Sequence, residues 1–261
     1  VGRIKKKGKN VSNVEIGDRV IAFTRFGSYA QEVITGGDAV AKISDDFEAG
    51  KALALATQYV TAYYSAYIAT RVMPGDKVLI QAAAGGVGSL AIQWLNSLGA
   101  IVIGTVGSEE KAEIAKTKGC HHTINYKTEN FVDRVKDITD GKGVNVVYDS
   151  VGKDTFEGSL DCLKVRGTMV TFGNASGPVP PIEPLILNAK GGIYLTRPSL
   201  AHYCGTHDDM VASANALFQA ISSGAIQIDV NQSYALYDAR KAHEDLEARK
   251  TTGSTILVPE H

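Results

Sequence analysis

The sequence predicts an α/β protein in which a doubly wound parallel sheet is inserted into a smaller β-rich domain. From Lys77 onward, short apolar runs alternate with stretches of helical periodicity, which is typical of a parallel sheet covered by helices. The two ends of the chain resemble each other in having short strands outside that alternation. We therefore expect a central domain at residues 58–197, and a second domain made from residues 1–57 and 198–261.

Local patterns predict the individual elements. Expected strands of the parallel sheet are 78–81, 101–105, 122–125, 144–149, 168–172 and 193–196. Expected helices include 59–70, 109–118, 129–139, 208–222 and 239–249. Outside the parallel sheet, we expect strands at 28–34, 39–43 and 254–258.

Composition limits the classes of function. The chain has 261 residues, 44% of them hydrophobic and 21% charged, with a formal net charge of −1. This near-neutral charge does not indicate a nucleic-acid or anionic-membrane partner. No apolar run approaches the length of a membrane span. The cysteines Cys120, Cys162 and Cys204 are odd in number and far apart, which predicts neither a disulfide framework nor a metal motif. We expect a cytoplasmic protein.

The first strand of the parallel sheet is followed by a glycine-rich turn and a helix. In the G-x-G-x-x-G fingerprint, Gly85 and Gly88 fill the second and third glycine positions, and Ala83 takes the first. Such a turn gathers backbone N–H groups and the positive end of the helix dipole where a pyrophosphate can bind. We expect Ala84, Gly85, Gly86, Val87 and Gly88 to form this site. The alternative is a glycine-rich turn that binds no ligand.

The end of the second strand distinguishes NADPH from NADH. An NAD site usually has an acidic residue there for the ribose diol, but residues 104–108 contain none. Glu109 and Glu110 follow Ser108, which is a typical helix N-cap, and acidic residues are routine in a first helical turn. With Lys111 nearby, the sequence predicts NADPH. Lys111 could equally be a solvated helix charge.

Several motifs together resemble one family. They are Gly17-Asp18-Arg19-Val20, residues 82–88, 147–152 and 172–174, and Thr196-Arg197-Pro198-Ser199-Leu200. The chain resembles the zinc-free, zeta-crystallin-like quinone oxidoreductases of the medium-chain dehydrogenase/reductase superfamily over nearly all of its length. The resemblance implies a Rossmann sheet inserted into a GroES-like catalytic domain, NADPH as cofactor and a quinone as substrate.

The resemblance also implies roles for single residues. Residues matching Ser108, Lys111, Tyr126 and Arg249 surround the 2′-phosphate, and those matching Thr61, Phe172, Gly173 and Asn174 lie near the nicotinamide. Each of three residues has an alternative role. Phe172 could pack in the core, Asn174 could cap a loop, and Arg249 could be a charge favoured at a helix C-terminus. Strands of the family's catalytic domain precede the residue aligned with Val1 and carry polar residues of the quinone pocket. We therefore expect a trimmed or incomplete chain, with a truly shortened protein as the alternative, and leave the catalytic residues unidentified.

The sequence predicts that no metal takes part. A structural zinc lobe would need four closely spaced cysteines after Val20, and residues 21–30 contain none. His121 and His122 are adjacent and lack the spacing of a metal pair. Reduction of a simple ketone would need a Lewis acid, whereas a reduced quinone is a delocalised phenolate. A metal-free site and a quinone substrate are therefore consistent.

Alternative functions keep the same fold. One is NADPH-dependent reduction of an activated alkene such as an enone. Another is a nucleotide-binding protein with little turnover, as when relatives serve as crystallins or bind RNA. We also expect a homodimer through the nucleotide-binding domains, because the last strand, within residues 191–195, is apolar and leaves an unpaired edge. The alternative is an edge covered by the chain's own loop at 178–187.

Overall fold

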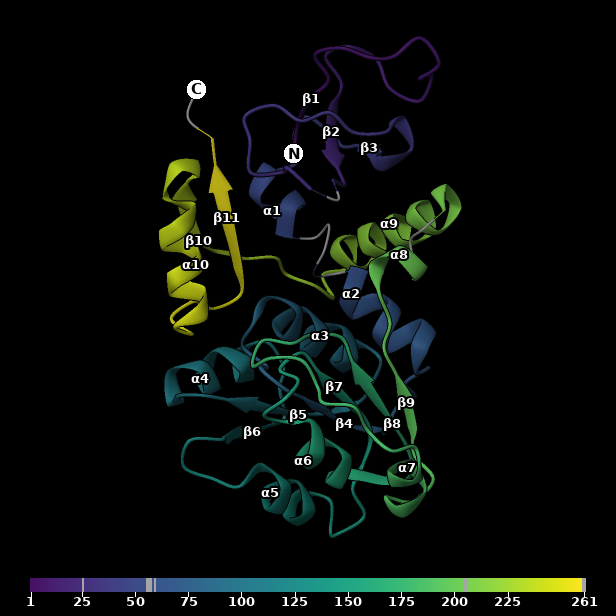
Figure 1. Cartoon of the computed structure of the whole chain (residues 1–261), viewed down its shortest axis with the longest axis vertical. Helices are drawn as coiled ribbons and strands as arrows, with labels where there is room; N and C mark the ends of the chain where they lie inside the picture. The colour runs from purple at the N-terminus through teal and green to yellow at the C-terminus, as the bar shows by residue number, and fades with distance from the viewer. Residues whose placement is uncertain (25, 55–57, 59, 204–205, 260–261) are drawn as a thin grey trace. The chain divides into compact units, whose positions relative to one another are not determined.

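A computed structural model describes residues 1–24, 26–54, 58, 60–203 and 206–259 (Figure 1). The chain forms two compact units. The first contains Val1–Thr57 together with Ile228–His261, and the second contains Gln58–Gln227. The second unit is thus inserted into the first along the chain, which confirms the expected architecture.

A six-stranded parallel sheet forms the centre of the second unit. Its strands occur in the order β6-β5-β4-β7-β8-β9, and every neighbouring pair is parallel. The bounds are β4 (Lys77–Ile80), β5 (Ile101–Val106), β6 (His122–Asn125), β7 (Val144–Asp149), β8 (Leu163–Thr171) and β9 (Tyr194–Thr196). This is the strand order of a Rossmann sheet, with its topological switch point between β4 and β7. The doubly wound sheet expected from the sequence is confirmed.

Helices cover both faces of this sheet (Figure 1). One face carries α3 (Gly86–Ser97) and α4 (Glu109–Thr117), and the other carries α5 (Phe131–Ile138) and α6 (Phe156–Asp161). The unit also contains α2 (Val60–Tyr63), the π-helical η3 (Tyr64–Ala69), α7 (Leu185–Ala189), α8 (Leu200–Tyr203) and α9 (His207–Ser222). None of the described helices is both long and apolar enough to cross a membrane.

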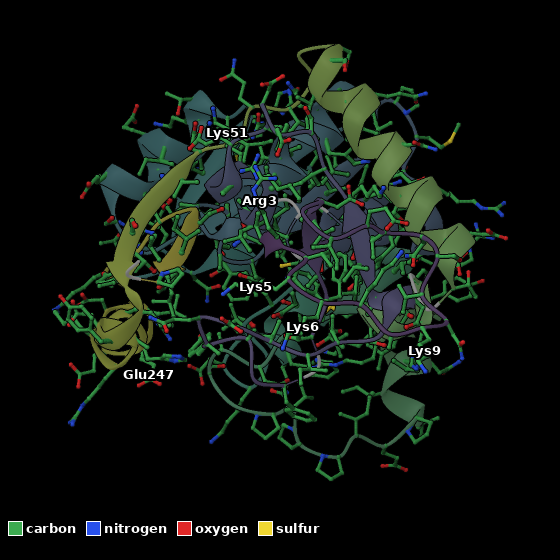
Figure 2. The ribbon with its side chains drawn as sticks, turned by 90° about the horizontal axis from the view of Figure 1, so that it is seen from above. Arg3, Lys5, Lys6, Lys9, Lys51 and Glu247 are labelled. Atoms are coloured by element: carbon green, nitrogen blue, oxygen red, sulfur yellow. The ribbon has the colours of Figure 1, made fainter. Side chains whose placement is uncertain are left out.

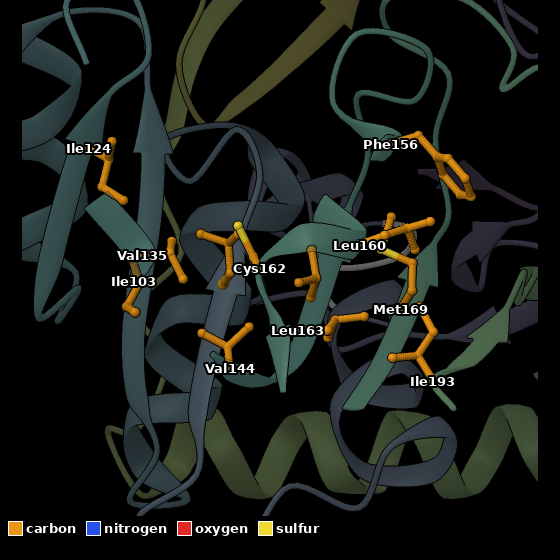
Figure 3. Close-up of a cluster of buried hydrophobic side chains, with 12 residues drawn as sticks. Ile103, Ile124, Val135, Val144, Phe156, Leu160, Cys162, Leu163, Met169 and Ile193 are labelled. Atoms are coloured by element: carbon orange, nitrogen blue, oxygen red, sulfur yellow. The ribbon is translucent and has the colours of Figure 1, made fainter. Parts of the chain in front are cut away.

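A buried apolar cluster joins the sheet to α5 and α6 (Figure 3). Alternate strand residues supply one side of it, including Leu79, Ile103, Ile124, Val147 and Met169. The facing helices contribute Val135, Phe156 and Leu160. Because the strands are buried on both faces, their apolar runs are nearly continuous rather than alternating.

The helices α8 and α9 belong to the second unit. The Tyr203 ring stacks on the Tyr64 ring with 4.8 Å between centroids. The Gln93 amide is bonded to the backbone of Gln227 through both of its polar atoms, at 3.1 and 2.8 Å. The division into units therefore falls at Gln227/Ile228, later in the chain than the 197/198 boundary expected from the sequence.

The first unit has two small sheets. One is antiparallel, made of β1 (Gly2–Arg3), β2 (Arg19–Ala22) and β3 (Val40–Lys42). The other is a parallel pair, β10 (Val230–Ala235) and β11 (Ser254–Val258), connected through α10 (Ala239–Glu247). The unit also contains α1 (Ala49–Ala54) and the 3₁₀ helices η1 (Gly37–Ala39) and η4 (Leu236–Asp238).

The strand expected at residues 28–34 is wrong. Residues 29–32 form bends, residues 28, 33 and 34 have no regular secondary structure, and the Ile34 side chain is fully exposed. None of the described strands pairs with this segment. A β-strand needs a neighbouring strand to pair with, so the apolar residues of this segment do not by themselves predict a strand.

The N-terminal segment carries a basic run, Lys5–Lys9, close to Arg3 in the sequence; Figure 2 labels Arg3, Lys5, Lys6 and Lys9. Arg3 pairs with Asp45 at 2.7 Å, Lys7 with Glu15 at 2.7 Å, and Lys5 with Glu32. Most of these side chains are exposed, and each such pair contributes about 0–1 kcal/mol. Arg3, Lys5 and Lys7 are therefore paired locally at the surface.

Candidate nucleotide-binding site

The candidate residues of the second unit gather at one edge of the parallel sheet. Because all six strands are parallel, the segments after their carboxyl ends meet at the same edge. The segments that follow β4, β5, β6, β7 and β8 include residues 82–88, 107–108, 126, 150–152 and 172–174. Arg249 follows α10 and belongs to the first unit, so its expected role at the 2′-phosphate stays a prediction.

The glycine turn packs tightly against the end of β4. A Cβ atom added to Gly88 would lie 2.5 Å from the carbonyl oxygen of Ala82 and 2.7 Å from that of Ala83. A Cβ on Gly85 would lie 3.2 Å from the same Ala82 oxygen. Only glycine at position 88 lets α3 start this close to the strand. The first N–H groups of α3 have no acceptor within the helix and are available to an anion.

Beneath this turn lies a buried polar chain that sequence reasoning missed. Gln81 donates to Ser159 Oγ at 3.0 Å and accepts from Thr105 Oγ1 at 2.6 Å. The Ser159 hydroxyl in turn donates to Asp149 at 2.9 Å. All four side chains are buried. A glutamine at the end of an apolar strand was the available signal, but its two side-chain partners lie on two other elements, β5 and α6.

The start of α4 brings together three of the four residues expected around the 2′-phosphate. Ser108 caps the helix, with its Oγ accepting from the Lys111 N–H at 3.3 Å. Tyr126 lies alongside, because a Cβ atom on Gly107 would approach the Tyr126 hydroxyl to 2.6 Å. Glu109 accepts a hydrogen bond from the Asn125 amide at 3.0 Å.

The loops after β7 and β8 are bonded to each other. The Phe172 N–H donates to the Asp149 carbonyl at 2.9 Å, and the Ala175 N–H donates to that of Ser150 at 3.2 Å. Arg197 supports the second loop by donating to Thr171 Oγ1 at 3.1 Å and to the Gly173 carbonyl at 3.2 Å. Arg197 therefore has a structural role in holding the Phe172–Asn174 segment.

Asp149 anchors the loop after β7. Its carboxylate accepts four hydrogen bonds, two from the Val151 and Gly152 N–H groups and two from the Thr155 and Ser159 hydroxyls, at 2.7–3.0 Å. A fully buried carboxylate with four donors is positioned as a structural acceptor rather than as a base.

A small cavity connects α2 with the glycine turn. Its volume is about 10 Å³, close to that of one water molecule. The lining includes Ala62 and Ser65 from the α2–η3 segment, Val87 and Gly88 from the turn, and Phe172. Thr61 is buried on α2 next to Ala62. The structure thus gathers the elements that carry the expected nicotinamide-side residues.

The described cysteines are unreactive. Cys120 and Cys162 are free and buried, and burial raises the pKa of each thiol to about 12. A thiol of that pKa is neither a nucleophile nor a ready metal ligand at neutral pH. Cys204 lies outside the described residues. Across the described part of the chain, no three His, Cys, Asp or Glu side chains form a group that could hold a metal ion.

A Rossmann sheet with a glycine turn beside its switch point defines a dinucleotide-binding protein. The family described as zinc-binding dehydrogenase matches residues 86–219. A quinone oxidoreductase of Salmonella typhimurium is 48% identical over 99% of this chain and 80% of its own length. A 2-haloacrylate reductase of a Burkholderia species is 40% identical over 98% of this chain and 78% of its own.

Solved structures agree with these relatives. The crystal structure of Escherichia coli quinone oxidoreductase complexed with NADPH superposes with a TM-score of 0.95 at 44% identity, over 99% of this chain and 80% of that one. The chain belongs to the quinone oxidoreductase family of the medium-chain dehydrogenase/reductase superfamily.

Proposed function

We propose that this protein transfers a hydride from NADPH to a quinone without a metal. The observation that carries the proposal is the glycine turn at the start of α3, in a chain 48% identical to a quinone oxidoreductase. NADPH is the cofactor, since a relative with 44% identity was solved in complex with it. When bound, NADPH supplies the hydride.

The residues present fit this cofactor. The Ala84–Gly88 backbone would hold the pyrophosphate, because the glycine at position 88 lets α3 begin close to the end of β4 and the first N–H groups of a helix bind anions. Ser108, Lys111 and Tyr126 would hold the 2′-phosphate, and Arg249 stays a candidate for the same role. Thr61 and the Phe172–Asn174 segment would orient the nicotinamide. Glu109 is bonded to Asn125, which favours phosphate over a bare ribose diol beside it.

A metal-free site suits a quinone acceptor. The oxygen of a reduced quinone is a delocalised phenolate, so it needs less charge stabilisation than the alkoxide from a simple ketone. The protein then has to orient the two reactants and exclude water. The bonded loops after β7 and β8 supply a rigid platform for that orientation.

Lys111→Ala is expected to weaken NADPH binding selectively. A charged hydrogen bond is worth about 1.5–3 kcal/mol, which corresponds to roughly a 10- to 150-fold rise in Kd. NADH lacks the 2′-phosphate, so its Kd should stay unchanged. Titration calorimetry with both cofactors measures the difference. Lys116→Ala is the control, because Lys116 lies at the other end of α4 and pairs with Glu113 at 2.7 Å; an equal loss for both cofactors in Lys111→Ala would contradict the assignment.

Reduction of an activated alkene is the second candidate function. It is favoured by the 40% identity to a 2-haloacrylate reductase. Steady-state kcat/KM values for a quinone and for an enone distinguish the two activities, and the proposal expects the quinone value to be higher. NADPH binding without turnover of either compound would favour a nucleotide-binding protein instead.

Turnover should survive metal removal. No cysteine cluster follows Val20 in the sequence, so we expect unchanged kcat after extended dialysis against a strong chelator. Elemental analysis of the purified protein should find far less than one zinc per chain. Stoichiometric zinc whose removal abolishes turnover would contradict a metal-free mechanism.

We further propose a cytoplasmic homodimer that pairs through β9. This strand is the last of the sheet, and exposed apolar residues surround it: Tyr194 is 63% exposed, Val165 70% and Leu185 66%. An unpaired apolar edge favours pairing with the same strand of a second copy across a two-fold axis. The buried free thiols Cys120 and Cys162 are consistent with a reducing compartment.

Tyr194→Lys is expected to convert the dimer to a monomer, because it places a charge in the proposed dimer interface along β9. Ile193 is less suitable for this test, since it is buried in the protein's own core. Multi-angle light scattering gives the mass. Tyr237→Lys is the control, since Tyr237 is 72% exposed but lies in the first unit. A native protein that has a monomer mass at every concentration refutes the dimer.

A further inference from the structure

The buried polar chain beneath the glycine turn ends on the backbone of the turn itself. Thr105 Oγ1 accepts a hydrogen bond from the Ala82 N–H at 3.2 Å, while the Thr105 carbonyl accepts from the Ala83 N–H at 2.9 Å. Thr105 therefore holds the second and third residues after β4 at once. The chain continues from its hydroxyl through Gln81 and Ser159 to Asp149.

The direction of every hydrogen bond in this chain is fixed. The Asp149 carboxylate can only accept, so the Ser159 hydroxyl donates to it. The Ser159 oxygen then accepts from the Gln81 amide nitrogen, which leaves the Gln81 carbonyl to accept from the Thr105 hydroxyl. The Thr105 oxygen is thereby left with a lone pair aimed at the Ala82 N–H. One buried carboxylate thus sets the polarity of a chain that crosses from β7 to β5.

Ala82 has a conformation that needs such support. Its φ angle is +59°, in the left-handed region that a residue with a Cβ atom rarely adopts. A strained backbone conformation of this kind persists only where the surrounding contacts hold it in place, and such conformations cluster at functional sites. The Ala82 carbonyl is also the atom that Gly85 bonds to at 3.0 Å and that a Cβ on Gly88 would meet. The conformation of Ala82 therefore sets where the turn and the start of α3 lie.

We propose that Thr105 is a positioning residue for NADPH. Through its hydroxyl, oriented by Gln81 and Ser159, it holds Ala82 in the left-handed conformation and so keeps the Ala84–Gly88 N–H groups where the pyrophosphate binds. This inference rests on the proposed assignment of the glycine turn to the pyrophosphate. Thr105 itself is 1% exposed and acts on the cofactor only through the turn.

The test compares Thr105→Val with variants that separate positioning from stability. Thr105→Val keeps the shape of the side chain but removes the hydroxyl, and it should raise the NADPH Kd about tenfold, the size of one lost hydrogen bond. Thr105→Ser keeps the hydroxyl and should bind NADPH as the native protein does. Thr139→Val is the matched control, because Thr139 is equally buried and bonded to Val135 and Gly143, away from the turn.

A second substitution distinguishes a role of Thr105 in positioning the turn from a purely structural role. Ala82→Gly removes the steric penalty of the left-handed conformation, since glycine adopts it freely. In the Thr105→Val background it should restore most of the NADPH affinity, although it adds no contact to the cofactor. A purely structural Thr105 would give no such rescue. The full chain is used throughout, with urea unfolding run in parallel so that each Kd refers to folded protein.

The outcomes are separable. Weaker NADPH binding in Thr105→Val, rescue by Ala82→Gly and an unchanged Kd in Thr139→Val support the proposal. An unchanged Kd in Thr105→Val, or a loss that Ala82→Gly does not relieve, overturns it. If Thr105→Val fails to fold, the same comparison is made with Gln81→Met and its Ala82→Gly double variant. Failure of the native protein to bind NADPH would instead refute the proposed function.

Discussion

Gly88→Ala is expected to abolish measurable NADPH binding and to lower the free energy of unfolding by about 1–3 kcal/mol. The added methyl group would lie within 2.9 Å of three backbone atoms of Ala82 and Ala83, which cannot rotate away as a side chain does. To make room, α3 must move away from β4, and the N–H groups of the turn move with it. Urea unfolding measures the stability, and fluorescence titration with NADPH measures the binding.

Gly86→Ala is the control for the stability effect. The three atoms nearest to a Cβ at Gly86 all belong to the side-chain amide of Gln58, which is the end of a flexible side chain and not backbone. Its free energy of unfolding should stay within about 0.5 kcal/mol of the native value. Native stability and native NADPH affinity in Gly88→Ala would show that the close approach of α3 to β4 is not required.

Asp149→Ala is expected to lower the free energy of unfolding by about 3–5 kcal/mol, or to prevent folding altogether. The substitution removes an acceptor of four hydrogen bonds at a site with 0% exposure. Two N–H groups and two hydroxyls would lose their partner away from bulk water. Far-UV circular dichroism during urea unfolding gives the change.

Asp161→Ala is the matched control for Asp149→Ala. Asp161 ends α6 and forms a partly exposed ion pair with Lys190. Removal of such a pair should change the stability by no more than about 1 kcal/mol. Equal losses at the two positions would mean that the burial and bonding of Asp149 confer no special stability.

The sheet and its glycine turn could be predicted because their signals are local. Apolar runs such as Val78–Ile80 and the spacing of Gly85 and Gly88 depend only on neighbours in the chain. The segment 28–34 has a similar apolar content, yet no described strand pairs with it, and pairing is not a local property. The assignment of α8 and α9 to the second unit likewise depends on contacts such as Tyr64–Tyr203, which are far apart in sequence.

The candidate site could also be predicted in part, again where its signals are local in the sequence. Ser108, Lys111 and Tyr126 were expected together, and the structure places them around the start of α4. The chain from Thr105 to Asp149 was missed because Gln81 and Ser159 are separated by 78 residues. A lone polar residue in an apolar strand indicates a buried partner but does not identify it. Arg249 stays a prediction, since it belongs to the other unit.

The central claim is hydride transfer from NADPH to a quinone at this site. A single-turnover experiment tests it most directly, with enzyme–NADPH complex mixed with excess quinone in the presence of a chelator. We predict that the reduced-nicotinamide absorbance disappears in one enzyme-dependent phase, with one hydroquinone formed for each NADPH oxidised. Gly88→Ala should show no such phase. A native complex that binds NADPH tightly and leaves it unoxidised in the presence of quinone would contradict the account.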